Sequence, residues 1–330
     1  PINTTVADLS VDTSAGAAFG NQWITESNGL TDLNLNAGAG DVTLTLTLGG
    51  ITDTAADGTD IAATNATVTL NDATAQNVGA AGAAGNVETS VDTLTVDTSA
   101  GGGNQFLSEA SGLTELLLNA GTGNVTLTTT GAGNVLSADA AVDILGNQVS
   151  ATLNNGDFGD TDTAAGNAIE TTATQLTVDT SNSGNNQFIR ETDGLTYLNL
   201  TANDGGGDVH LYAGAAVTQG AGVVTASGLQ LLGPGGFTLT TNTNDVVTLA
   251  AEVTGAGNAF TYVDADALSI GSVGGTDGVR TNNGAINIST VAGNLTVTNT
   301  AAANDVWSNS SDAGTGGTMT LTAGGLDSLF

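Results

Sequence analysis

A phrase of thirteen residues occurs three times in this chain at almost constant spacing. It reads NQWITESNGLTDL from Asn21, NQFLSEASGLTEL from Asn104 and NQFIRETDGLTYL from Asn186. The two intervals between successive copies are equal to within one residue. Spacing this regular indicates that the chain is built from a structural repeat, and we call these thirteen residues the repeat phrase.

The stretches that follow each repeat phrase have the pattern of β-strands. Apolar residues alternate with threonine in VTLT from Val42, VTLT from Val125 and LTVT from Leu295. This alternation buries one face of a strand and exposes the other, and Val and Thr both favour the pleated conformation. Turns such as NAGAGD and NAGTGN supply the positive φ angles that tight turns need. We therefore predict an all-β chain with almost no helix.

The length of the repeat favours a β-solenoid. An antiparallel sandwich is the alternative, but its repeats would be whole domains with a more varied aromatic core. A period of about 82 residues divides into four coils of about 20 residues, the size of a solenoid turn. We predict one continuous right-handed parallel β-helix over residues 1–330. Its super-repeats would cover approximately 4–87, 88–169 and 170–250, with a divergent solenoid continuation over 251–330.

The charge of the chain restricts its partners. The formal net charge is -31, and the basic side chains are Arg190, Arg280 and a single histidine. Nothing in this sequence could neutralise phosphates, so we predict no nucleic-acid partner and no attraction to anionic membranes. No apolar run approaches the length that spans a bilayer, so no direct membrane insertion is expected. Cysteine is absent, which excludes disulfides and thiolate chemistry.

Several stretches resemble the β-strand repeats of filamentous-haemagglutinin-like and autotransporter-type bacterial surface proteins. They are NQFLSEASGLTELLLNAGTGNVTLTTTGAGNV from Asn104, LLGPGGFTLTTNTNDVVTLAAEVTG from Leu231, YVDADALSIGSVGG from Tyr262 and TNNGAINISTVAGNLTVTNT from Thr281. The resemblance implies secretion and a β-helical stalk. We therefore expect an extracellular or cell-surface bacterial protein with a structural or adhesive role, as a stalk or fibre segment.

Two kinds of partner fit this expectation. One is a neighbouring copy, or further repeats of the same protein, joined end to end, which would make the chain a self-assembling filament or biofilm-matrix subunit. The other is a surface glycan or a host or cell-surface protein. A polysaccharide-active β-helix enzyme and an ice-binding solenoid are further alternatives. His210 stands where the other copies have Thr43 and Thr126, so we expect it at the surface and predict no catalysis.

Calcium is the metal that the sequence favours, although no cofactor is required. The stretch DFGDTD places Asp157, Asp160 and Asp162 in a glycine-containing loop, and clustered hard oxygen ligands are what Ca²⁺ selects. The stretch is neither an EF-hand loop nor the nonapeptide of calcium-binding β-rolls. A solvated acidic loop is the alternative interpretation.

The repeat phrase itself allows two interpretations. Its aromatic residue, which is Trp23, Phe106 or Phe188, could form a binding step together with the glutamate that follows it in the phrase, which is Glu26, Glu109 or Glu191. Alternatively, the aromatic ring is a packing anchor in the core or at a corner, the Asn-Gln pair bonds to the backbone and the glutamate stays in water. We favour the packing interpretation.

Overall fold

The computed structural model describes residues 1–15, 20–53, 58–82, 84–160, 167–298, 306–308 and 316–325. These described residues form strands and turns without a helix, which confirms the all-β prediction. Consequently no helix in this part of the chain has the length and apolarity to cross a membrane. The chain forms two compact units, Pro1–Gly156 with Ala165–Thr172, and Asp157–Ala164 with Ala173–Phe330.

The first unit is built from short strands. They are β1 (Ile2–Thr4), β2 (Asp8–Asp12), β3 (Gln22–Glu26), β4 (Asp32–Asn36), β5 (Asp41–Leu46), β6 (Ile61–Ala62), β7 (Asn65–Leu70), β8 (Val87–Ser90), β9 (Thr93–Asp97), β10 (Gln105–Glu109), β11 (Glu115–Asn119), β12 (Val125–Ala132), β13 (Ile144–Asn155) and residues 169–172 of β14 (Ile169–Asp179).

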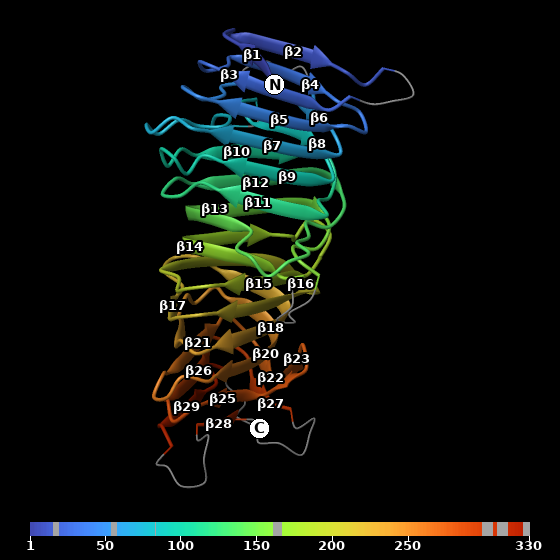
Figure 1. The fold of residues 1–330 in the computed structure, drawn as a ribbon. Helices are drawn as coiled ribbons and strands as arrows, with labels where there is room; N and C mark the ends of the chain where they lie inside the picture. The colour runs from blue at the N-terminus through green and yellow to red at the C-terminus, as the bar shows by residue number, and fades with distance from the viewer. Residues whose placement is uncertain are drawn as a thin grey trace. The chain divides into compact units, whose positions relative to one another are not determined.

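These strands stack in two parallel ladders (Figure 1). Ladder one contains β1, β3, β5, β7, β9 and β11. Ladder two contains β2, β4, β6, β8, β10 and β12. Strand β13 pairs with β11 through its first residues and with β12 through later ones. The chain thus alternates between the ladders as it winds, and the unit is a parallel β-solenoid, as predicted.

The coils are longer than predicted, and fewer of them make up a super-repeat. Turns are roughly 23 residues apart. Strand β2 lies in ladder two, whereas its counterpart β9 in the next copy lies in ladder one, three and a half turns later. Fewer residues of the chain separate the stacked partners Gln22 and Val42 than separate the stacked partners Asn65 and Thr93. Loops that leave the ladders add these extra residues, so the number of turns cannot be read from the period alone.

The core consists of aliphatic side chains that stack from turn to turn. One row follows ladder one through Ile24, Leu44, Val68, Val96 and Leu118. Each of these side chains is at most 2% exposed. Burying one aliphatic side chain stabilises the fold by roughly 1.5 to 3 kcal/mol. The alternating threonines face outward, as the sequence pattern predicts.

The second unit repeats the parallel stacking with a third ladder. Its strands are residues 173–179 of β14, β15 (Gln187–Glu191), β16 (Tyr197–Ala213), β17 (Val217–Thr218), β18 (Val224–Gly233), β19 (Phe237–Leu239), β20 (Asp245–Val253), β21 (Phe260–Asp264), β22 (Leu268–Ile270), β23 (Ser272–Val273), β24 (Thr276–Asp277), β25 (Val279–Thr281), β26 (Ile286–Thr290), β27 (Leu295–Val297), β28 (Val306–Trp307) and β29 (Met319–Thr322).

Among the described residues of the second unit, the strand pairings are parallel apart from one hairpin. Strand β16 pairs with β14, β15 and β18, and β18 pairs with β20. The third ladder runs through β17, β19, β21, β26 and β29. Strands β23 and β24 form an antiparallel hairpin. This unit is also a β-solenoid, and a single continuous solenoid over residues 1–330 stays a prediction.

Close stacking makes certain glycines irreplaceable. A Cβ atom at Gly103 would lie 1.7 Å from the carbonyl oxygen of Gln76, a backbone atom that cannot move away. A Cβ atom at Gly146 would lie 3.1 Å from its nearest neighbour. We predict that Gly103→Ala lowers the free energy of unfolding by about 3 kcal/mol or more, while Gly146→Ala has a much smaller effect. Urea denaturation measures both, and equal effects would contradict the stacking.

Candidate functional site

The glutamine of each repeat phrase points into the molecule. Its Nε2 atom donates a hydrogen bond to the backbone oxygen of the strand that precedes it along the chain. These bonds are Gln22 to Val11 (3.1 Å), Gln105 to Val96 (3.0 Å) and Gln187 to Val178 (3.2 Å). The three glutamines are at most 3% exposed. The phrase thus joins the two sides of a turn in all three copies.

The asparagine before it links one turn to the next. Its Oδ1 atom accepts a hydrogen bond from a backbone N–H one turn further along the chain. The bonds are Asp41 to Asn21 (3.0 Å), Asn124 to Asn104 (2.8 Å) and Asp208 to Asn186 (2.9 Å). These contacts confirm the prediction that the Asn-Gln pair bonds to the backbone.

The glutamate of the phrase is buried, contrary to the prediction that it stays in water. Glu26, Glu109 and Glu191 are all 0% exposed. Glu26 accepts hydrogen bonds from the backbone N–H groups of Ser27 (2.8 Å) and Asn28 (3.1 Å). Strand periodicity explains the placement, because the glutamate lies an even number of residues after the buried glutamine. The carboxylate satisfies N–H groups at the corner where the strand ends.

The aromatic residue of the phrase lies on the outer face and not in the core, which leaves packing at the surface as the remaining form of the packing interpretation. Trp23 is 55% exposed. Phe106 is half-buried and lines a groove. The ring of Phe188 stacks on that of His210, with ring centroids 4.6 Å apart. The aromatic comes directly after the inward glutamine, so the pleat turns it outward, and its surroundings differ in each copy.

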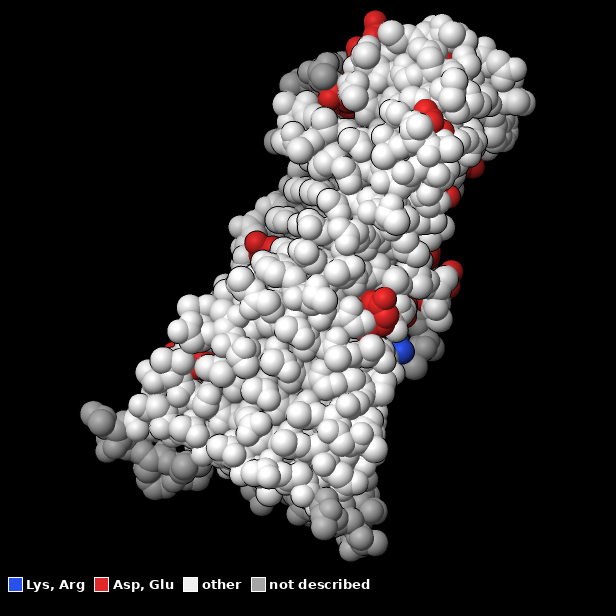
Figure 2. All heavy atoms as spheres, turned by 90° about the vertical axis from the view of Figure 1, so that its left-hand side faces the viewer, with Lys and Arg blue, Asp and Glu red and all other residues white. Residues whose placement is uncertain are grey.

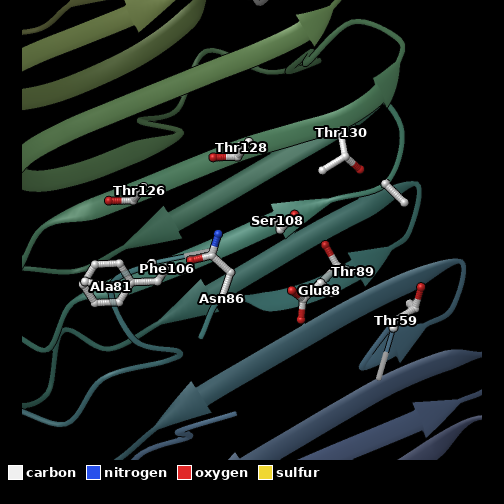
Figure 3. A pocket seen from close by; sticks show the side chains of 13 residues that line it. Thr59, Ala81, Asn86, Glu88, Thr89, Phe106, Ser108, Thr126, Thr128 and Thr130 are labelled. Atoms are coloured by element: carbon white, nitrogen blue, oxygen red, sulfur yellow. The ribbon is translucent and has the colours of Figure 1, made fainter. Parts of the chain in front are cut away.

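A groove of about 660 Å³ lies on the outer face of ladder two in the first unit (Figure 3). Its floor comes from β8, β10 and β12, and the loops before β6 and β8 border it. Lining residues are Gly58, Thr59, Ala81, Gly82, Asn86, Glu88, Thr89, Phe106, Ser108, Ala110, Thr126, Thr128 and Thr130. In Figure 3, Thr126, Thr128 and Thr130 follow one strand. The groove combines hydroxyl groups, one amide, one carboxylate and one aromatic ring.

Glu88 also belongs to a cluster of three carboxylates. Oxygen atoms of Asp53, Asp60 and Glu88 all lie within 4.8 Å of one another. Asp53 and Asp60 are each 1% exposed, and Glu88 is half-buried. Burial, together with the carboxyl of Asp53, raises the pKa of Asp60 to about 9. We call these three residues the acidic corner.

A second group of carboxylates lies in the next copy of the repeat. Oxygen atoms of Glu115, Asp139 and Asp143 are also within 4.8 Å of one another. Here each carboxylate accepts hydrogen bonds. Asp143 accepts one from the hydroxyl of Ser137 (2.7 Å), Glu115 accepts one from the N–H of Ala138, and Asp139 accepts one from the backbone N–H of the second residue after it. Burial raises the pKa of Asp143 to about 8.

The acidic corner lies outside the repeat phrase, so the pattern that predicts the solenoid does not point to it. Asp60 recurs as Asp143 one super-repeat later, and Glu88 recurs in the same way as Glu170. An alignment of whole super-repeats would have found both pairs. Eight carboxylates among the described residues are buried, and the face in Figure 2 shows exposed acidic side chains in small separate groups.

Two of the three calcium ligands predicted from the sequence lie in the described residues. Asp157 accepts a hydrogen bond from the backbone N–H of Asn186 (2.7 Å). Asp160 is exposed. Asp162 lies outside the described residues, so calcium binding by the three together stays a prediction.

His210 is not at the surface, which corrects the expectation drawn from its outward position. It is 7% exposed. Its Nδ1 atom lies 2.8 Å from Oε1 of Gln230, whose Nε2 atom donates to the hydroxyl of Thr276 (2.8 Å) on the β23–β24 hairpin. The hairpin thus covers this part of the outer face.

Both arginines have partners within the second unit. Arg280 lies 3.9 Å from the carboxylate of Glu252. The guanidinium of Arg190 lies 4.3 Å from the centroid of the Tyr212 ring. Both contacts are of the kind that fix a side chain on the outer surface.

No protein-family profile, curated protein or solved structure matches the chain.

Two glutamates of the repeat phrase differ in their pKa values. For Glu26, hydrogen bonds from Thr4, Asn28, Ser27 and Val6 outweigh the effect of burial and lower the pKa. For Glu109, burial dominates over its donors and raises the pKa. A lowered pKa in the folded state stabilises the protein above the unfolded pKa, and this stabilisation is lost as pH falls. A raised pKa has the opposite consequence, because stability falls as pH rises above the unfolded value.

We therefore predict opposite pH dependence for two matched variants. Relative to the unsubstituted protein, Glu26→Gln becomes less stable as pH rises from about 3.5 to about 7, and Glu109→Gln becomes more stable. Urea denaturation across this pH range measures both. The same sign of change in both variants would show that the two carboxylates are in equivalent environments.

Proposed function

We propose that the chain is a structural or adhesive segment of an extracellular bacterial surface protein, a β-solenoid stalk or fibre. One observation carries this proposal. The repeat phrase places its polar residues inside, where the glutamine and asparagine join strands and turns with the same contacts in three copies. The hydrogen bonds that recur in the three copies are therefore those that hold the solenoid together.

The position of the aromatic residues supports a scaffold rather than a repeated ligand array. Strand β3 lies in ladder one and β10 in ladder two, so Trp23 and Phe106 emerge on different ladders. Repeated binding steps along one face would require the same ladder in each copy. The outward-facing residues differ from copy to copy, so we expect a ligand to bind at one place and not at every copy of the repeat.

The groove is the place where we propose that adhesion occurs, with a glycan as the ligand. Aromatic faces pack against sugar rings, and hydroxyl, amide and carboxylate groups bond to sugar hydroxyls. Glu88 lines the groove, and neither arginine of the chain does so. This charge favours a neutral or amino-sugar polymer over a uronate.

The same groove does not support glycoside hydrolysis. That reaction requires two carboxylates on either side of the scissile bond. The carboxylates grouped with Glu88 are those of Asp53 and Asp60, which are 1% exposed and do not line the groove. We therefore propose binding without catalysis.

We predict that Phe106→Ala weakens glycan binding by about tenfold or more. Trp23→Ala is the matched control, because it removes the aromatic residue from the same place in the phrase but outside the groove. Binding is measured on immobilised neutral, amino-sugar and uronate polysaccharides, and the supernatants are assayed for new reducing ends, which we expect to be absent. Equal binding by both variants would exclude the groove, and sustained release of reducing ends that Glu88→Gln abolishes would establish an enzyme.

A self-assembling filament or biofilm-matrix subunit is the alternative proposal. Electron microscopy and light scattering of the purified chain distinguish the two. We expect monodisperse particles at micromolar concentration. End-to-end filaments whose length increases with concentration would support the alternative.

A further inference from the structure

The acidic corner has the dimensions of a cation site. Oxygen atoms of Asp53, Asp60 and Glu88 lie within 4.8 Å of one another. Calcium binds oxygen at about 2.4 Å, so two of its ligands are at most about 4.8 Å apart. One ion can therefore contact all three carboxylates. Acidic side chains also cluster in many proteins without binding an ion, so the hydrogen bonding of these carboxylates must distinguish the two cases.

The next copy of the repeat holds the same backbone arrangement. The N–H of Asp60 donates to the carbonyl oxygen of Glu88 at 2.8 Å, and the N–H of Asp143 donates to that of Glu170 at 2.9 Å. In return, Oδ2 of Asp60 accepts from the N–H of Glu88 at 2.6 Å, and Oδ2 of Asp143 accepts from that of Glu170 at 2.7 Å. The two corners can therefore be compared atom by atom.

They differ at the side chain beside Oδ1 of this aspartate. In the second copy, the hydroxyl of Ser137 donates to Oδ1 of Asp143 at 2.7 Å. In the first copy, Asp53 occupies the place of Ser137, and Oδ1 of Asp60 is buried without a hydrogen-bond partner. A donor has been replaced by a second acceptor beside a carboxylate that is 1% exposed. No basic side chain of the first unit can compensate this oxygen atom, so a shared proton or a cation would have to do so.

The sequence limits what that partner can be. Both arginines and the histidine belong to the second unit, and the chain has no lysine. The remaining candidates are a proton and a metal ion. One bound proton reduces the negative charge of the three carboxyl groups by a single unit. A divalent ion compensates two charges and offers coordination to all three groups.

We propose that Asp53, Asp60 and Glu88 bind a divalent cation, with Ca²⁺ favoured by the all-oxygen ligand set. Glu88 also lines the groove, so the ion would lower the negative charge at the groove wall. The site itself does not depend on the proposed adhesive function.

Isothermal titration with CaCl₂ and thermal unfolding test this proposal on the full chain. For the unsubstituted protein we expect a higher melting temperature in calcium than in chelator, because an ion that binds the folded state stabilises it. Asp53→Ser reproduces the side chain of the second copy. We expect this variant to bind one ion fewer, and its melting temperature in chelator to exceed that of the unsubstituted protein, because the serine donates to Asp60.

Asp92→Asn is the matched control, since it removes an exposed carboxylate of the first unit outside the acidic corner and should leave the calcium response unchanged. Circular dichroism establishes that the variants are folded, and Asp60→Asn is a second variant should Asp53→Ser not fold. The proposal is overturned if the unsubstituted protein binds no calcium, which leaves a shared proton as the partner. It is equally overturned if Asp53→Ser binds as many ions as the unsubstituted protein.

Discussion

The hydrogen-bonded ladder between turns is the constraint on which both units depend. Parallel neighbours lie about 4.8 Å apart, so each residue in a strand stacks on the residue at the same place in the adjacent turn. Apolar residues must then form rows, such as the one from Ile24 to Leu118, and any extra residues must leave the ladder as a loop. The buried side chains repeat from turn to turn because stacked strands require it, whereas the loops outside the ladder can differ in length and sequence.

Corners are the weak points of such a fold, because the chain leaves the ladder there and N–H groups lose their partners. The repeat phrase meets this need with internal side chains: the glutamine bonds across the turn and the glutamate accepts N–H groups at the corner. A buried carboxylate without compensation costs several kcal/mol, and this chain has almost no basic side chains to provide it. Backbone donors compensate Glu26, but they only partly compensate Glu109, so the pKa values of the two glutamates move in opposite directions.

The sequence predicted the solenoid because period, alternation and turn residues all agree. It could not give the number of turns, since the loops between Asn65 and Thr93 lengthen one turn without changing the strand pattern. The orientation of the repeat phrase was wrong for a related reason. Residue type suggested a packed aromatic and an exposed glutamate. In a strand, however, every second residue faces the same side, so Glu109 is buried on the same side as Gln105. The position of a residue in the strand therefore predicts its burial better than its type does, and this position can be read from the sequence.

The groove and the acidic corner both lie where loops lengthen the turns of the first unit. Residues 58–59 and 81–82 border the groove, and Asp53 and Asp60 precede β6 in the same region. The first and second copies have almost the same ladder there, but Asp53 in one is Ser137 in the other. A single substitution in a loop thus changes the chemistry of a corner while the ladder beneath it stays unchanged. Because the first and second copies fall on different ladders, each can have its own outer surface without disturbing the interior rows that both copies share.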